Sequence, residues 1–278
     1  MALSFQELDF PSPTIPVTIT SVIHVQPADP IPASWGDTLY LSNLDDIVGA
    51  RVFTPTVYFY RSNSNPSEKP KPVFQALRDA LSKVLVPYYP FSGRIKEAEN
   101  GKLEVFFAPQ QGALMVEAYS DLPLSELGDL QVPNPGWMPL VYRFPVEEPY
   151  KVIDMPLVIA QVTSFKCGSF SLGLRLCHCI CDGLGAMQFL NAWAATARTG
   201  SLVATPTPRW DREVLKPRQP PNVTYPHTEF MKVEDGSTLS MCLWQEKPVQ
   251  RCYRVDREFQ ARVKALARKK GKFRIQYV

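Results

Sequence analysis

The chain has 278 residues, of which 45% are hydrophobic and 21% charged, and its formal net charge at pH 7 is +3. Such a length suits one large domain or two, and the scattered, slightly basic charge is unlike the pattern of nucleic-acid-binding proteins. No apolar run approaches the ~20 residues of a transmembrane helix and the first residues lack the features of a signal peptide, so we expect a cytoplasmic protein with no membrane span and no nucleic-acid partner.

The first hundred residues predict two strands and one helix. Residues 17–25 and 52–61 are rich in β-branched and aromatic side chains, which favours strands, and Pro55 places the second run at a sheet edge or in a bend. Residues 72–86 predict a helix, because apolar residues recur at steps of three and four: Phe74, Leu77, Leu81 and Leu85. We interpret the aromatic run 88–94 as a helix stop with packed rings.

The middle of the chain predicts further strands and a second helix. The strands are expected at residues 103–107, 113–118, 157–164 and 169–178. A tight turn at residues 166–168 joins the last two. His178 has the parity of Leu172 and Leu174, so a strand that persists to this point aims the imidazole toward the covered side. A helix over residues 184–198 follows, with one apolar face: Met187, Leu190, Trp193 and Ala197.

Proline marks the crossover between two parts of the chain. Prolines are frequent over residues 206–226, and proline removes amide donors and restricts the residue before it, so we expect an extended, semi-rigid segment. We predict three parts: an N-terminal domain over 1–200, a linker over 201–226 and the start of a further domain over 227–278.

The last part of the chain predicts one strand and one helix. Residues 250–255 favour a strand, and residues 256–270 favour a helix with Asp256 as its N-cap. The basic residues of 262–274 fit the polar face and end of that helix better than a nucleic-acid patch. Strands and helices mixed in this way indicate an α/β or α+β fold.

The six residues His178-Cys179-Ile180-Cys181-Asp182-Gly183 carry the strongest chemical signal, because they lie between a strand and a helix. A histidine is suited to accept a proton near neutral pH. Of the three histidines, His24 is expected at a strand end and His227 in the linker, so His178 is the best candidate base. The alternative is a structural one: His178 buried against a carbonyl, with Asp182 capping the next helix.

The cysteines and the hydroxyl side chains each leave two interpretations open. Six cysteines without obvious pairs suggest reduced thiols, and the alternation of Cys177, Cys179 and Cys181 around a histidine fits buried structural thiols better than a zinc site or a Cys–His nucleophile. Thr56 and Tyr58 share one strand face, where their hydroxyls either line a pocket or cap an edge. The chain lacks the motifs of dinucleotide-binding, P-loop and serine-hydrolase sites.

Several segments together resemble the plant BAHD acyltransferases, which transfer acyl groups from acyl-CoA thioesters to alcohols or amines. They are LSNLDD (41–46), FTPTVYFYR (53–61), LSKVLVPYYPFSGR (81–94), HCICDG (178–183) with GAMQFLNAW after it, and PRWDREVLKPRQPP (208–221). Their order and spacing fit the family up to about residue 272. The resemblance implies a two-domain fold like that of chloramphenicol acetyltransferase, with the active site in a channel between the domains.

The resemblance also implies roles for individual residues. His178 is the general base, Asp182 holds the motif loop through an arginine, and Gly183 permits the sharp turn. Thr56 and Tyr58 match acceptor-pocket positions of hydroxycinnamoyl transferases. Phe53 stands where shikimate-using relatives carry a histidine, which favours a more apolar acceptor, and the stretch after the motif looks closest to transferases of feruloyl groups onto ω-hydroxy fatty acids or fatty alcohols. The implied partners are an acyl-CoA co-substrate and a small alcohol or amine, with no bound cofactor or metal, and a monomer is expected.

The chain also departs from the family pattern. The Asp-Phe-Gly-Trp-Gly motif of the second domain is absent, so we expect an N-terminal domain that is complete or nearly so and a truncated C-terminal domain. A missing channel wall leaves His178 in solvent, which weakens electrostatic catalysis. The chain is therefore expected to be weakly active or inactive, and the alternative hypothesis is a non-catalytic interaction partner.

Overall fold

The structure is a computed structural model that describes residues 14–32, 36–62, 72–132, 134–144, 152–228, 253 and 255–270. The chain divides into two units. The larger consists of Pro13–Leu130 and Gly136–Asn222 and contains every named strand, and the smaller includes Val223–Val278.

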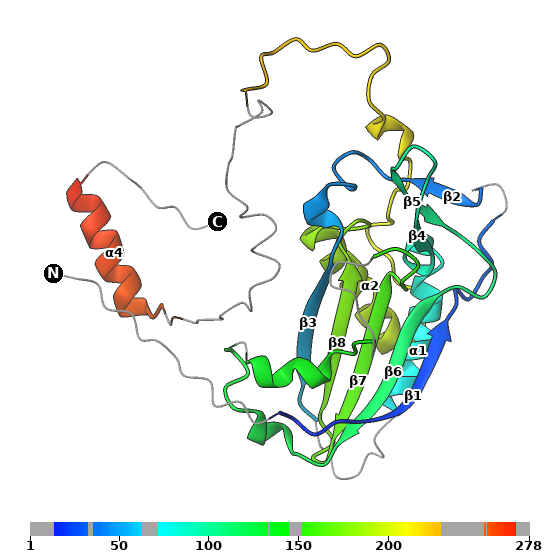
Figure 1. Cartoon of the computed structure of the whole chain (residues 1–278). Helices are drawn as coiled ribbons and strands as arrows, with labels where there is room; N and C mark the ends of the chain where they lie inside the picture. The colour runs from blue at the N-terminus through cyan, green and yellow to red at the C-terminus, as the bar shows by residue number, and fades with distance from the viewer. Residues whose placement is uncertain are drawn as a thin grey trace. The chain divides into compact units, whose positions relative to one another are not determined.

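A mixed five-stranded sheet forms the centre of the larger unit (Figure 1). Its strand order is β1-β6-β7-β8-β3, with bounds β1 Thr18–Val25, β6 Ala113–Ser120, β7 Val158–Phe165, β8 Phe170–Cys177 and β3 Phe53–Tyr60. Strands β6 and β7 are parallel, and the other pairs are antiparallel. The predicted edge position of the strand that contains Pro55 is confirmed, because β3 ends the sheet and an edge strand tolerates a missing amide donor.

A second sheet of three short strands lies in the same unit. Its order is β2-β5-β4, with bounds β2 Thr38–Tyr40, β5 Leu103–Phe106 and β4 Arg94–Glu97. Only β5 was predicted, because its four residues alternate between buried and half-buried positions. Strand β2 has only three residues, and the four residues of β4 do not alternate. Arg94, at the start of β4, is buried, and its guanidinium donates to the carbonyl oxygens of Gly93 and Gly112 at 2.8 and 2.9 Å.

Helices α1 (Val73–Val84) and α2 (Gly183–Thr199) pack on each other and on one face of the large sheet, as predicted in type and place. The expected apolar face of α2 is wrong in part. Trp193 is buried, but Met187 is 45% exposed. The buried face is turned toward α1 and the aromatic run instead, and consists of Phe189, Ala192, Trp193 and Thr196.

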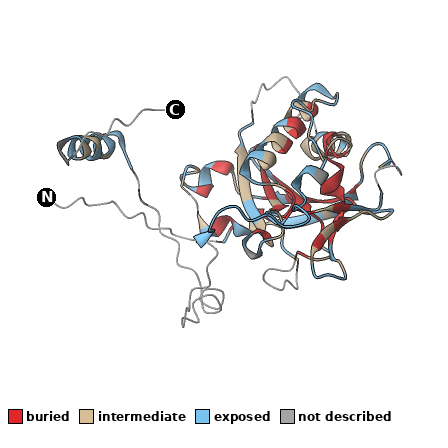
Figure 2. Cartoon of the chain, turned by 90° about the horizontal axis from the view of Figure 1, so that it is seen from above, coloured by how far each residue is buried: buried red, intermediate tan, exposed pale blue. Residues whose placement is uncertain are grey.

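The opposite face of the large sheet is covered by short 3₁₀ segments. They contribute Leu124, Leu127, Trp137 and Leu140 to a second apolar cluster with Phe165. Figure 2 shows the buried residues concentrated in the strands and the inward sides of the helices. The 3₁₀ segments within the described residues are η2 Val48–Ala50, η3 Tyr89–Ser92, η4 Leu124–Leu127, η5 Pro135–Leu140 and η6 Glu213–Leu215.

Two local predictions are also confirmed. A tight turn joins β7 to β8, in which the amide of Gly168 donates to the carbonyl of Phe165 at 2.9 Å and Gly168 has a φ of 79°. The left-handed backbone favours glycine there. The aromatic run after α1 is a packed stop, with Tyr88, Tyr89 and Phe91 buried.

In the smaller unit, helix α4 spans Arg257–Lys270. Asp256 caps it as predicted, because its Oδ1 accepts from the amide of Phe259 at 2.7 Å. The predicted strand at 250–255 and much of the predicted domain at 227–278 lie outside the described residues, so the domain boundaries at 200 and 226 stay predictions. None of the described helices combines the length and the apolar character that crossing a membrane requires.

Candidate functional site

His178 lies directly after the end of β8 and is exposed. Its amide donates to the carbonyl of Val52 at 2.8 Å, which extends the pairing of β8 with β3 by one bond. Residues 178–180 then form a turn. The strand therefore does not persist to His178, and the imidazole is not held against the covered face of the sheet as the strand parity implied.

Asp182 is the N-cap of α2. Its Oδ1 accepts a hydrogen bond from the amide of Gly185 at 2.8 Å, and the amide of Ala186 donates to its carbonyl at 2.9 Å. A carboxylate suits the N-cap position because it accepts a hydrogen bond from a backbone amide that has no partner within the helix. Its negative charge also interacts favourably with the positive end of the helix dipole. Among the described residues no arginine pairs with Asp182. The interaction of Asp182 that holds the motif loop there is its N-cap hydrogen bond with the Gly185 amide.

Replacement of Asp182 by alanine is expected to destabilise the fold by about 1 kcal/mol, the usual cost of removing such a cap. Asparagine keeps an acceptor oxygen and is expected to recover most of that loss. Urea unfolding of both variants measures the two values. If alanine and asparagine cost the same, the hydrogen bond to Gly185 is not what Asp182 contributes.

Gly183 of the motif and Gly185 just after it differ in how the local structure constrains them. Gly183 is the first residue of α2, its backbone is not left-handed, and a Cβ there would meet no described heavy atom within 4 Å. Steric demand at the turn therefore does not explain Gly183, contrary to the expected role. At Gly185 a Cβ would lie 3.2 Å from Cβ of Cys181 and 3.4 Å from Oδ1 of Asp182, so the cap itself favours glycine at this position.

His178 and Asp182 line a cavity of about 610 Å³ within the larger unit, called here the His178 cavity. Four stretches far apart in the sequence form its walls. The residues are Leu44, Asp45, Ile47, Gly49 and Ala50; Tyr88 and Phe91; His178, Ile180, Cys181, Asp182, Gly185 and Gln188; and Pro208, Arg209, Trp210 and Arg212. Of the three histidines only His178 lines it.

The wall at residues 208–212, called here the strap, belongs to the predicted crossover. Trp210 donates from Nε1 to the carbonyl of Pro87 at 2.9 Å and lies edge-on to the rings of Tyr88 and Phe91. Arg212 donates to Oδ2 of Asp45 at 2.6 Å. The sequence interpretation gave these residues no role, although the acidic pair of LSNLDD and the arginine of PRWDRE offered complementary charges.

The three tentative acceptor residues lie on β3 and do not line the His178 cavity. Phe53 is opposite Cys177 at the end of the β3–β8 pair and so is next to the strand end that carries His178. Thr56 and Tyr58 lie further along β3, on one face as predicted, opposite Leu174 and Leu172. The Tyr58 hydroxyl is 3.9 Å from Sδ of Met187 on α2.

The three thiols in and beside the motif are buried or half-buried. Cys177 and Cys179 are buried, and the Cys179 Sγ donates to the carbonyl of Ala50 at 3.2 Å. Burial, with Asp182 nearby, raises the pKa of Cys181 to about 12. The hydrogen bond with Cys179, together with burial, raises the pKa of Cys177 well above its usual range. The same hydrogen bond lowers the pKa of Cys179, but this thiol is buried and does not line the His178 cavity. Neutral thiols such as Cys177 and Cys181 are poor nucleophiles and poor metal ligands. The described residues contain no group of side chains that could hold a metal ion.

Iodoacetamide at pH 8 is expected to label Cys167 well before Cys177 and Cys181. Cys167 is exposed, and the amide of Leu124 donates to its sulfur at 3.4 Å, one of the hydrogen bonds that lower its pKa despite some desolvation. Both its larger thiolate fraction and its greater exposure to the reagent favour labelling of Cys167. Mass spectrometry of peptides over a time course measures the order, and rapid labelling of Cys181 in the folded chain would contradict the neutral-thiol interpretation.

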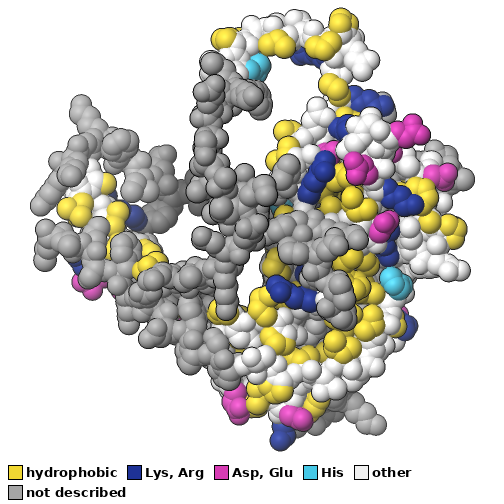
Figure 3. Space-filling view, in the orientation of Figure 1, with side chains coloured by type: hydrophobic (Ala, Val, Ile, Leu, Met, Phe, Trp, Pro, Cys, Tyr) yellow, Lys and Arg dark blue, Asp and Glu magenta, His cyan; other side chains and the backbone are white. Residues whose placement is uncertain are grey.

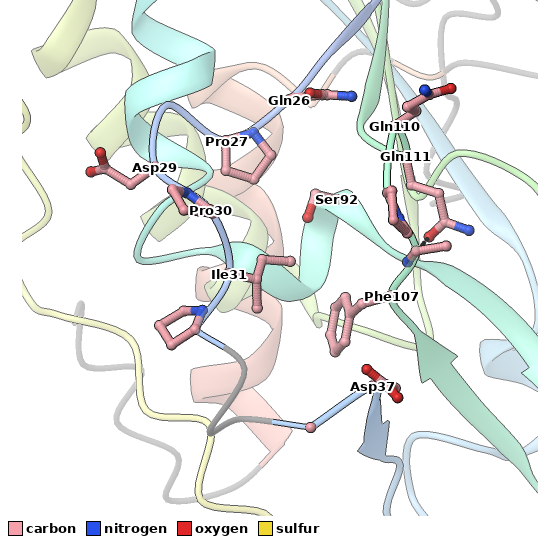
Figure 4. A pocket seen from close by; sticks show the side chains of 14 residues that line it. Gln26, Pro27, Asp29, Pro30, Ile31, Asp37, Ser92, Phe107, Gln110 and Gln111 are labelled. Carbon is pink, nitrogen blue, oxygen red and sulfur yellow. Dashed lines mark hydrogen bonds between the residues drawn. The ribbon is translucent and has the colours of Figure 1, made fainter.

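A second cavity, of about 570 Å³, lies between the segment after β1 and the segment after β5. Figure 4 shows Pro27, Pro30 and Ile31 on one side of it and Phe107 and Gln111 on the other. Its lining contains no histidine or cysteine, so it offers no base comparable to His178. In Figure 3 basic and acidic side chains are intermixed on the visible face of the larger unit.

Comparison with protein families adds the decisive observation: a family model described as "Transferase family" matches residues 15–272. The chain belongs to this family. The match confirms the resemblance to the BAHD acyltransferases that the sequence motifs suggested. Members are acyl-transferring enzymes, and their mixed α/β fold agrees with the sheets described above.

Named relatives support this membership of the Transferase family. The chain is 38% identical over 220 residues to omega-hydroxypalmitate O-feruloyl transferase of Arabidopsis thaliana, covering 79% of this chain and 46% of that protein. It is 35% identical over 254 residues to fatty alcohol:caffeoyl-CoA acyltransferase of the same plant, covering 90% of this chain and 57% of that protein.

A solved structure in the family has the same fold. The crystal structure of vinorine synthase matches with a TM-score of 0.54 and 27% identity, covering 70% of this chain and 46% of that one. The chain spans about half the length of the curated relatives it matches.

Proposed function

We propose that this chain carries the base-bearing part of an acyl-CoA-dependent acyltransferase. One observation carries the proposal: in a member of an acyltransferase family, an exposed histidine lines a cavity of about 610 Å³ at the end of a strand. Histidine is the side chain best suited to accept a proton near pH 7. The larger unit also provides walls on which a substrate can lie.

The proposed reaction needs two proton transfers, to and from His178, and one displacement at the thioester carbon. The neutral imidazole of His178 takes the proton of the acceptor hydroxyl or amine, and the freed oxygen or nitrogen attacks the thioester carbonyl carbon. A bond from that atom to carbon forms, the carbon–sulfur bond breaks, and the CoA sulfur leaves with the proton that the imidazolium returns. Acyl-CoA is thus a co-substrate, and no bound cofactor or metal enters the proposal.

The protein thiols have no part in this reaction. A covalent acyl-cysteine intermediate needs an accessible thiolate. The raised pKa values of Cys177 and Cys181 keep these thiols protonated, and Cys179, whose pKa is lowered, is buried outside the cavity lining. Asp182 supports the loop as the cap of α2 and does not exchange protons with the substrate in this scheme.

We propose hydroxycinnamoyl groups as the acyl class and an apolar alcohol as the acceptor. Two relatives are named for feruloyl and caffeoyl-CoA transfer to a hydroxy fatty acid and a fatty alcohol. Phe53, beside the strand end that carries His178, presents an aromatic ring rather than a polar group. Thr56 and Tyr58, on the same strand, are proposed as further acceptor contacts.

The test is release of CoA by the 278-residue chain. Feruloyl-, p-coumaroyl-, malonyl- and acetyl-CoA are each combined with ω-hydroxypalmitate, a fatty alcohol, a phenolic and an amine. The proposal expects slow release that requires an acceptor and is fastest with a hydroxycinnamoyl donor. No release from folded protein with any pair would overturn it.

That negative result would favour the alternative of a non-catalytic interaction partner. The observation behind the alternative is the exposure of apolar side chains that line the His178 cavity, where Leu44 is 80% and Ile47 is 53% exposed. Exposed apolar residues that gather in one place favour contact with another protein surface.

A further inference from the structure

The strap and the loop at residues 41–50 form two walls of the His178 cavity, and one ion pair joins them. Arg212 of the strap and Asp45 of the loop are 2.6 Å apart and 167 positions apart in the sequence. Their side chains are 13% and 23% exposed. A pair that is mostly shielded from water is screened less than a surface pair. Breaking it is therefore expected to cost more free energy than breaking a surface ion pair.

Each partner of this pair is also fixed on its own side. Oδ2 of Asp45 accepts from the amide of Ser42 at 2.9 Å, and the Ser42 hydroxyl accepts from the amide of Asp45 at 3.3 Å. The guanidinium of Arg212 lies 5.7 Å from the centre of the Trp210 ring, which is itself anchored on Pro87. The ion pair therefore links two rigid local structures rather than two loose side chains.

We propose that Arg212 and Asp45 form a clasp that sets the separation of the two walls, and that Arg212 is a positioning residue for the reaction. The second part rests on the proposed function. Arg212 acts through the walls: with the clasp closed, loop and strap hold the substrate against the histidine side of the cavity. With the clasp open, the walls move independently and substrate binding weakens.

Hydrogen–deuterium exchange tests the clasp without any need for turnover. Arg212→Gln and Asp45→Asn each remove one charge, and asparagine keeps an acceptor for the Ser42 amide. Either change is expected to speed exchange about fivefold in peptides from both walls, 41–50 and 208–215. The double variant is expected to exchange no faster than either single one, because the interaction is already lost.

Two comparisons make this test specific. Arg212→Lys keeps the charge but loses the planar guanidinium, so its exchange is expected to lie between the unaltered chain and Arg212→Gln. Arg78→Ala breaks the exposed pair with Asp79 on α1, away from the cavity, and is expected to change neither wall. Effects confined to the mutated wall, or adding fully in the double variant, would overturn the clasp.

Kinetics test the positioning role separately. Arg212→Gln is expected to raise the KM for the substrate about tenfold and to lower kcat less than about twofold, with partial recovery in Arg212→Lys. A drop in kcat alone would overturn the role. Absence of CoA release from the unaltered chain would overturn the proposed function and the positioning role together, whereas the exchange measurement decides the clasp in either case.

Discussion

Replacement of His178 by alanine is expected to lower the rate of CoA release roughly 100- to 10,000-fold, the range that general-base catalysis contributes. The change removes the proton acceptor of the proposed reaction. The imidazole is exposed, and the loop is held by the His178 amide and by the Asp182 cap, neither of which alanine disturbs. The melting temperature is therefore expected to stay within about 1–2 °C.

The matched control is His24→Ala. His24 is also exposed, but it lies on β1 and does not line the His178 cavity. CoA release is measured with a hydroxycinnamoyl donor and an alcohol over a range of concentrations for both variants. Equal rates in His178→Ala and the unaltered chain would remove His178 from the mechanism.

Replacement of Trp193 by alanine is expected to have the largest effect on stability, about 3–5 kcal/mol. Trp193 is 1% exposed, packs against Phe189, and donates from Nε1 to the carbonyl of Leu77 at 2.8 Å. Alanine leaves a cavity between α1 and α2 and removes the hydrogen bond to the Leu77 carbonyl. Because domains of this kind are stable by about 5–15 kcal/mol in total, the loss is a large share.

Urea unfolding followed by circular dichroism measures this loss. Leu184→Ala is the control, because Leu184 is a large apolar residue of the same helix that is 69% exposed, and a surface change typically costs less than about 0.5 kcal/mol. Similar losses in the two variants would mean that the interface of α1 and α2 contributes little to the stability of the larger unit.

The sequence predicted the long elements and their types because their patterns are strong. Strand β3 is recognisable from its β-branched and aromatic residues, and the effect of Pro55 follows from the missing amide donor. The short strands β2 and β4 have no such pattern. The orientation of α2 also escaped prediction, because Phe189 and Met187 are both apolar and only the packing partner decides which of them is buried.

The candidate site shows the same division. His178 and Asp182 could be found from the local sequence, since a strand end, a histidine and a helix cap lie within six residues. The pairing of Asp45 with Arg212 could not, because the two residues become neighbours only when the chain folds. The ladder bond from the His178 amide to Val52 likewise depends on the pairing of β8 with β3, and the turn at residues 178–180 that follows it takes the chain out of the sheet.

The strap also bears on the order in which the site is made during synthesis. It is the last of the four stretches of the His178 cavity to leave the ribosome, and it closes on a loop made 167 residues earlier. Closing so long a loop carries an entropic cost that local elements do not have to meet. Strands and helices of the larger unit can therefore form while the nascent chain still lacks a complete cavity, and a substrate meets finished walls only after residue 212 has docked.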